Sequence, residues 1–199
     1  WSHCRLNKTI TDNYDLKAWF YKRENAEDIS KQVDNPDIIG FSNFVWNSQL
    51  NHKLAKEIKK KYPKCKVVFG GLGNPNKNRL NNFFEEYDYI DIVVNGEGEL
   101  TFENIRLELL KDKPNYKNVE GISTKDYVTM DRQRIKDLDS MPSPYLDGLF
   151  DKILLDNPND TFEAALESVR GCPYQCTFCE IGDKYFQKIE KQSNEKVFA

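Results

Sequence analysis

The chain has 199 residues, enough for one full domain and part of another, since domains usually contain about 100–200 residues. Hydrophobic residues make up 39% and charged residues 31%, and no apolar run approaches the roughly 18 residues that suggest a membrane span. The net charge of −3, with both signs interspersed, gives no basic face for a nucleic-acid backbone. We therefore expect a soluble, globular protein with no membrane partner, and the composition gives no support for a nucleic-acid partner.

The chain opens on Trp1, with neither an initiator methionine nor the pattern of a signal peptide. We expect it to start inside a longer protein. Its five cysteines are an odd number, so a disulfide framework explains them poorly. A reducing, cytoplasmic compartment is the better assumption, and it leaves metal or redox chemistry for the cysteines.

Short apolar runs alternate with helical patterns over the first 110 residues. The expected elements are a strand at 37–42, a helix at 50–62, a strand at 66–71, a helix at 79–87, a strand at 89–99 and a helix at 101–110. Three strand–helix units in series predict a parallel sheet covered by helices.

Small residues stand at the predicted carboxyl ends of these strands. Ser42, Gly70 and Gly71 end the first two runs, and Gly96-Glu97-Gly98 ends the third. Ligands bind outside the carboxyl ends of parallel strands. Glycines there either let a ligand approach the backbone or simply form tight turns, and the sequence leaves both readings open.

The pattern changes after the third unit. Residues 121–131 predict a hairpin or a short excursion at the sheet edge, and the proline-punctuated stretch that follows predicts a linker. The alternation within 161–171 predicts another strand, with a cysteine loop at its carboxyl end. The expected division is an α/β domain over 1–130, a linker over 131–160 and the start of a second domain over 161–199.

Three cysteines lie within eight residues in the sequence RGCPYQCTFCE. Cys172, Cys176 and Cys179 have the spacing C-x3-C-x2-C. Thiolates bind soft metals and iron–sulfur clusters. Three of them without a fourth suit a [4Fe–4S] cluster in which one iron lacks a protein ligand and can bind a substrate or cofactor.

A zinc site remains the alternative for the same loop. A zinc ribbon offers two C-x2-C pairs, but the remaining Cys4 and Cys65 lie more than a hundred residues upstream. His3 and His52 are equally remote. Zinc would therefore need a fourth ligand brought from a distance.

The cysteine loop resembles the signature of radical S-adenosylmethionine (SAM) enzymes, including the aromatic Phe178 before the last cysteine. The resemblance implies that Cys172, Cys176 and Cys179 ligate the cluster, and that SAM chelates the open iron. Reductive cleavage of SAM then gives methionine and a 5′-deoxyadenosyl radical. It also implies an electron donor such as flavodoxin or ferredoxin. Phe178 is a candidate cofactor contact, or else it only packs under the loop.

The first 115 residues resemble the cobalamin-binding domain of one large radical SAM subclass. Ser42-Asn43-Phe44, Gly70-Gly71 and the segment DIVVNGEGE stand where such domains carry their strand-end motifs, with Phe44 in place of leucine. The resemblance implies a Rossmann-like, flavodoxin-like fold. The implied cobalamin contacts are Ser42, Gly70, Gly71, Gly96, Glu97 and Gly98. The sequence has no Asp-x-His-x-x-Gly motif, but that motif follows the first strand of such domains, which we expect to lie before Trp1. Most radical enzymes of this subclass lack the histidine, so the resemblance implies cobalt without a lower imidazole ligand.

The same family places its cluster loop after the first strand of a TIM-type barrel. We therefore expect 161–199 to form the first βα unit of that barrel, with Tyr185, Phe186 and Ile189 facing inward on its helix. The chain is expected to be an amino-terminal fragment of a cobalamin-dependent radical SAM enzyme, inactive alone. The parent would use the radical for methyl transfer or rearrangement. The alternative is a non-catalytic α/β ligand-binding module whose cysteines hold a structural or electron-transfer metal.

Overall fold

A computed structural model describes residues 1–15, 20, 22, 24–75, 77, 80, 82–179, 181 and 186–199. The chain divides into two compact units. Lys8–Arg132 form one, here called the sheet unit, and Trp1–Asn7 join Gln133–Ala199 in the other, here called the cysteine unit. The boundaries expected at 130 and 160 stay a prediction.

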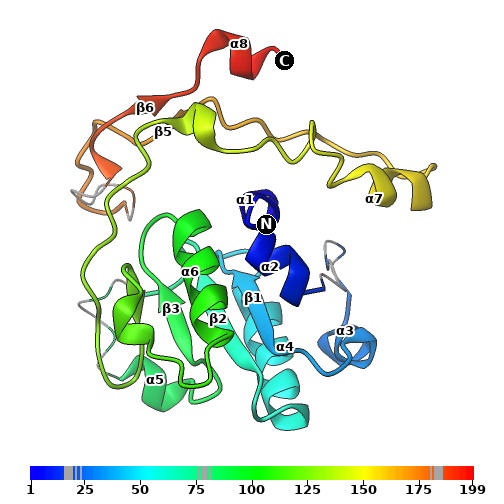
Figure 1. The fold of residues 1–199 in the computed structure, drawn as a ribbon, viewed down its shortest axis with the longest axis vertical. Helices are drawn as coiled ribbons and strands as arrows, with labels where there is room; N and C mark the ends of the chain where they lie inside the picture. The colour runs from blue at the N-terminus through cyan, green and yellow to red at the C-terminus, as the bar shows by residue number, and fades with distance from the viewer. Residues whose placement is uncertain are drawn as a thin grey trace. The chain divides into compact units, whose positions relative to one another are not determined.

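In the described residues, the sheet unit contains four strands in the spatial order β1-β2-β3-β4, and Figure 1 labels the first three. The strands are β1 (Ile38–Ser42), β2 (Lys66–Gly70), β3 (Ile92–Val94) and β4 (Ile122–Ser123). The first three are parallel and β4 runs antiparallel to β3. The three predicted parallel strands are therefore confirmed. The hairpin expected over 121–131 is present too, with Ser123 bridged to Val128.

Helices cover both faces of this sheet. They are α2 (Lys8–Asn13), α3 (Ala26–Gln32), α4 (Ser48–Lys61), α5 (Phe83–Glu86), α6 (Glu99–Leu109) and the 3₁₀ turn η2 (Tyr116–Asn118). Of the helix predicted over 79–87, residues 79 and 81 lie outside the described residues, and α5 occupies its second half. The sequence reading missed α3, although Asn25 accepts a hydrogen bond from the backbone N–H of Glu27 as an N-cap.

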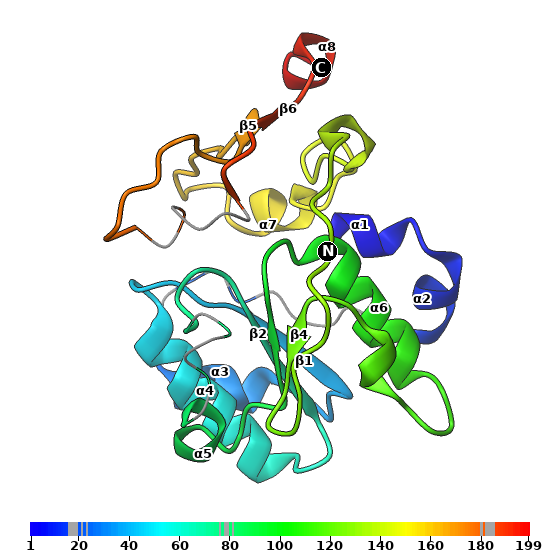
Figure 2. The ribbon, with the colours of Figure 1, turned by 90° about the vertical axis from the view of Figure 1, so that its left-hand side faces the viewer.

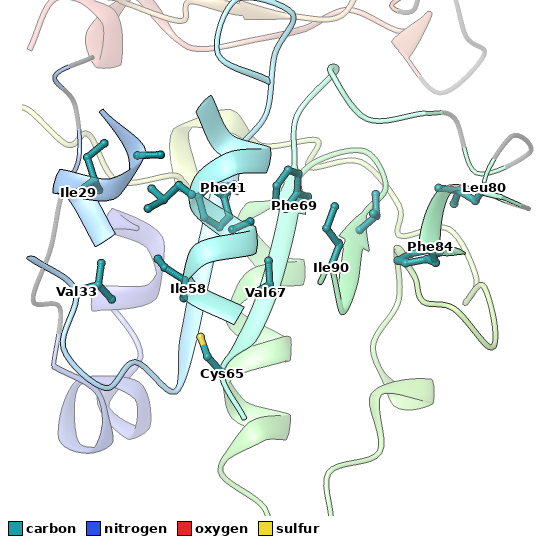
Figure 3. Close-up of a cluster of buried hydrophobic side chains, with 14 residues drawn as sticks. Ile29, Val33, Phe41, Ile58, Cys65, Val67, Phe69, Leu80, Phe84 and Ile90 are labelled. Carbon is teal, nitrogen blue, oxygen red and sulfur yellow. The ribbon is translucent and has the colours of Figure 1, made fainter. Parts of the chain in front are cut away.

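The core consists of two apolar clusters, one on each face of the sheet. Val67 and Phe69 of β2 face α3 and α4, where Ile58 is fully buried (Figure 3). Val68, between them, faces the cluster that contains Ile105 of α6. Successive side chains of a strand point to opposite faces, so a run of apolar residues fills both clusters. Figure 2 shows the resulting layers, with α4 and α6 on opposite sides of the strands.

The cysteine unit contains little regular structure. Its elements are α1 (Ser2–Arg5), η3 (Leu138–Ser140), α7 (Asp151–Asp156), β5 (Val169–Arg170), β6 (Glu190–Lys191) and α8 (Asn194–Val197). Side chains hold the irregular segments together. The Tyr145 hydroxyl donates to the carbonyl of Ala165 and accepts from its N–H, at 3.1 and 2.9 Å. Asp139 accepts from the N–H of Ser193 at 2.9 Å.

The first βα unit of a barrel is not confirmed. Within the predicted strand 161–171 only Val169–Arg170 pair, and their partner β6 is antiparallel. The helix expected after the loop is limited to α8 in the described residues, and Tyr185 lies outside them. A strand needs a neighbour to satisfy its backbone and a layer to cover its apolar side chains. Within the described residues no strand pairs with 161–168, whose backbone is bonded by the Tyr145 hydroxyl at Ala165 and by the N–H of Gln192 at Ser168. Leu166 is 69% exposed.

In the part of the chain that the structure describes, no helix combines the length and the apolar character needed to cross a membrane.

Candidate functional site

The predicted cobalamin contacts gather at one edge of the sheet unit. Ser42 and Gly70 are register partners at the carboxyl ends of the parallel strands β1 and β2. Gly96, Glu97 and Gly98 form the connection between β3 and the start of α6. All of them therefore lie at the carboxyl edge, where open α/β sheets bind ligands. Their contact with a cofactor remains a prediction.

The glycines at this edge differ in what surrounds them. Gly71 has a φ of +91°, and a Cβ there would lie 2.6 Å from the backbone oxygen of Asn43. The chain itself therefore requires glycine at position 71, as the tight-turn reading states. A Cβ on Gly98 would meet nothing within 4 Å. Gly98 thus faces open space, which a ligand can occupy.

Asparagine side chains hold the β1 end of this edge. Asn43 is fully buried, and its Oδ1 accepts from Nδ2 of Asn51 at 3.2 Å. Asn47 Nδ2 donates to the carbonyl of Ser42 at 2.9 Å, and Asn51 Nδ2 lies 3.1 Å from the same oxygen. Asn43 Nδ2 donates to Oδ1 of Asn74 at 3.1 Å, which ties in the loop after β2. The i, i+4, i+8 spacing of Asn43, Asn47 and Asn51 was visible in the sequence, but the sequence reading missed it.

Large apolar side chains are exposed on the two loops of the same edge. Val45 and Trp46, between β1 and α4, are 86% and 66% exposed, and Leu72 after β2 is 40% exposed. Trp46 stacks on Phe44 with ring centroids 4.7 Å apart and planes 2° apart. Exposed apolar groups gathered beside open backbone favour a large, partly apolar ligand. We call Val45, Trp46 and Leu72 the apolar rim.

The cysteine loop carries three free thiols. Cys172 is partly exposed, whereas Cys176 and Cys179 are exposed. The N–H of Cys179 donates to the carbonyl of Cys176 at 3.0 Å, and the N–H of Cys172 to that of Phe186 at 2.8 Å. Phe178 is 90% exposed, so it does not pack under the loop.

The side chains of this loop are suitable ligands for an iron–sulfur cluster, although the structure does not bring them together into a metal-binding group. Three accessible thiols on eight residues are the ligands that a [4Fe–4S] cluster uses. In the described ranges, the structure gathers no group of three His, Cys, Asp or Glu side chains that could hold a metal ion. The identity and accessibility of the cysteines therefore support the cluster, and their assignment as its ligands remains a prediction.

Two of the four upstream candidates for a fourth zinc ligand, Cys65 and the partly buried His52, are packed within the sheet unit. Cys65 is 1% exposed, and burial raises the pKa of its thiol to about 11, which disfavours the thiolate that binds metal. Burial also lowers the pKa of His52. The His52 ring packs on Phe69 and Tyr87, and its Nδ1 lies 2.9 Å from the Tyr89 hydroxyl. Both residues are thus explained by packing.

No protein-family model matches the chain. The chain is 32% identical to the cobalamin-dependent radical SAM methyltransferase TokK of Streptomyces tokunonensis, with 98% of this chain and 29% of the relative covered. It has the same identity and coverage with the 2-(S-pantetheinyl)-carbapenam-3-carboxylate methyltransferase of Streptantibioticus cattleyicolor. The chain belongs to the cobalamin-dependent radical SAM family.

The relationship extends beyond these two proteins. The chain is 26% identical to the hopanoid C-3 methylase of Methylococcus capsulatus, with 92% of the chain and 36% of the relative covered. It spans less than a third of the length of the first two family members. The similarity covers both the sheet unit and the cysteine unit, because 98% of the chain is aligned.

Proposed function

We propose that the protein acts as a cobalamin-dependent radical SAM methyltransferase. In this proposal the sheet unit binds cobalamin, while Cys172, Cys176 and Cys179 hold a [4Fe–4S] cluster that binds SAM. The observation that carries it is the loop of three free, accessible thiols in a chain that aligns almost completely with methyltransferases of this family.

Two features of the sheet unit support cobalamin at its carboxyl edge. Gly98 leaves open space beside the backbone, and the apolar rim offers exposed hydrophobic surface on the neighbouring loops. Ser42, Gly70, Gly71, Gly96 and Glu97 complete the proposed contact set. In this proposal the contacts rest mainly on the backbone and on shape.

When bound, the cluster, SAM and cobalamin supply radical and methyl-transfer chemistry, and the chain's own residues bind and shield them. Phe178 presents an exposed aromatic ring next to Cys179, suited to contact with the adenosyl group. A reduced flavodoxin or ferredoxin would supply the electron.

The methyl acceptor is not assigned. One relative is named for a carbapenam carboxylate that carries a pantetheinyl group, and another for carbon 3 of a hopanoid. These acceptors differ, but both relatives are named for methylation. We therefore propose methyl transfer for this protein without naming its acceptor.

SAM cleavage by the full-length protein is the test. The protein is purified without oxygen, reconstituted with iron and sulfide, reduced and incubated with SAM, and 5′-deoxyadenosine is quantified. We expect 5′-deoxyadenosine from the wild type and none from alanine variants of Cys172, Cys176 or Cys179. Cys65→Ala is the matched control, because it removes a buried cysteine outside the loop.

The outcome separates the proposal from a binding module. A cluster that forms in the wild type but never cleaves SAM would contradict the enzyme function and favour a structural or electron-transfer metal. Cobalamin is tested separately, by retention of its visible spectrum after gel filtration with hydroxocobalamin.

A further inference from the structure

Arg134 contacts the backbone on both sides of the cysteine loop. Its guanidinium donates to the carbonyl oxygen of Arg170 at 3.1 Å and to that of Lys188. Arg170 ends β5, and Lys188 lies two residues before β6. One planar fork therefore joins the chain entering the loop to the chain leaving it.

The same two backbone segments meet at the base of the loop through other contacts. Gly171 has a φ of +114°, and a Cβ there would clash with the backbone oxygen of Lys188. The N–H of Cys172 donates to the Phe186 carbonyl at 2.8 Å. The Arg134 guanidinium also lies 5.9 Å from the centroid of the Phe186 ring. The Lys188 carbonyl thus accepts from Arg134 and lies against Gly171. Gly171 immediately precedes the first cysteine of the loop.

The backbone ladder between these segments is short. Two residue pairs make up the β5–β6 ladder, and a two-stranded ribbon of that length is marginal in water. The side chains of Arg170 and Lys188 form ion pairs with Glu167 and Glu190, each on its own segment. The Arg134 guanidinium donates to both segments at once, to the carbonyl of Arg170 and to that of Lys188.

We propose that Arg134 is a positioning residue for the iron–sulfur cluster, because it fixes the base of the loop that carries Cys172, Cys176 and Cys179. The inference rests on the proposed cluster ligation. Groups that orient metal ligands typically change metal affinity about 10- to 100-fold when removed.

Three variants separate the roles of Arg134. Arg134→Met removes the fork and the charge, and Arg134→Lys keeps the charge but loses the planar pair of donors. Arg132→Met is the matched control, because Arg132 donates to Thr101 Oγ1 in the sheet unit.

The first measurement is amide hydrogen exchange of the cluster-free protein. We expect faster exchange over residues 169–179 and 186–191 in both Arg134 variants, and wild-type exchange in Arg132→Met. Unchanged exchange in Arg134→Met would overturn the positioning role, whether or not a cluster forms.

The second measurement is iron release to a chelator from the reconstituted full-length protein, with the electron paramagnetic resonance (EPR) spectrum of the reduced cluster. We expect release about 10- to 100-fold faster in Arg134→Met and Arg134→Lys, with an altered spectrum. If Arg134→Lys has the wild-type rate and spectrum, the two guanidinium donors are not required. Arg134 would then act through its charge alone. A wild type that holds no cluster would defeat the proposed function, while the exchange measurement still decides the positioning of the loop.

Discussion

At Gly71 the chain itself excludes a side chain, because φ is positive and a Cβ would meet the backbone of Asn43. Gly98 has ordinary helical angles and open space around it. The two glycines looked alike in the sequence, and only three-dimensional neighbours separate them. Substitutions at these positions should therefore affect different properties.

Gly98→Leu should fold normally and lose cobalamin. Its side chain would enter the space that we assign to the ligand, and we expect retention of hydroxocobalamin to fall about tenfold or more, equal to about 1.4 kcal/mol. Gly98→Ser is the matched control, because serine is small and a good N-cap for α6. Equal affinity of wild type and Gly98→Leu in a spectral titration would place the ligand elsewhere.

Gly71→Ala should instead lower stability. A non-glycine residue held in a sparsely populated backbone region costs about 1–3 kcal/mol, and the close approach to Asn43 adds to that cost. Urea unfolding checks it, with Gly70→Ala as the control, since a Cβ there meets Val94 at an ordinary 3.9 Å. Wild-type stability of Gly71→Ala would mean that position 71 adopts another conformation.

His52 should make the sheet unit less stable in mild acid. Burial lowers the pKa of His52 below its usual value of 6.5, against the opposing influence of Glu86. Below pH 6.5 the unfolded chain therefore binds more protons than the folded one, and the free energy of unfolding decreases as the pH falls. His52→Asn should flatten this slope in denaturant titrations between about pH 7 and pH 5. The same slope in both proteins would contradict a lowered pKa of His52 in the folded chain.

Among the elements, the strands and helices of the sheet unit were the most predictable from sequence. The run of Val67, Val68 and Phe69 supplies both faces of β2, so a short apolar stretch bounded by glycine was sufficient to predict a strand. Apolar residues also alternate along 161–171. Whether such a segment pairs as a strand depends on a neighbouring strand, however, and a local pattern gives no information about that neighbour. The pattern therefore predicted a strand over the whole of 161–171, whereas the structure has a strand only at Val169–Arg170.

The first turn of α4 should stabilise the carboxyl edge through Asn51. Asn51→Ala would leave the buried Oδ1 of Asn43 without its Asn51 donor, which typically costs about 1–3 kcal/mol. Gln49→Ala on the same helix is the control, because Gln49 is exposed. If urea unfolding gives equal stabilities for the two variants, the asparagine network contributes nothing measurable.

For the whole molecule, sequence reasoning reached the family from two short motifs, and the alignment over 98% of the chain agrees. The geometry of the cysteine loop was less accessible to sequence reasoning. Arg134, Asp139 and Tyr145 lie in the stretch expected to be a linker. Their side chains nevertheless bond the backbone of Arg170, Ser193 and Ala165, respectively. Hydrogen bonds from side chains to distant backbone groups produce no periodic pattern in a sequence, so they could not be predicted from it.

The central claim is that the three cysteines hold a [4Fe–4S] cluster with an iron open to SAM. Its most direct test is the EPR spectrum of the anaerobically reconstituted, reduced full-length protein, recorded with and without SAM. We predict a [4Fe–4S]⁺ signal that changes when SAM is added and is absent from the Cys176→Ala variant. A signal that SAM leaves unchanged, or one that persists in Cys176→Ala, would contradict the account.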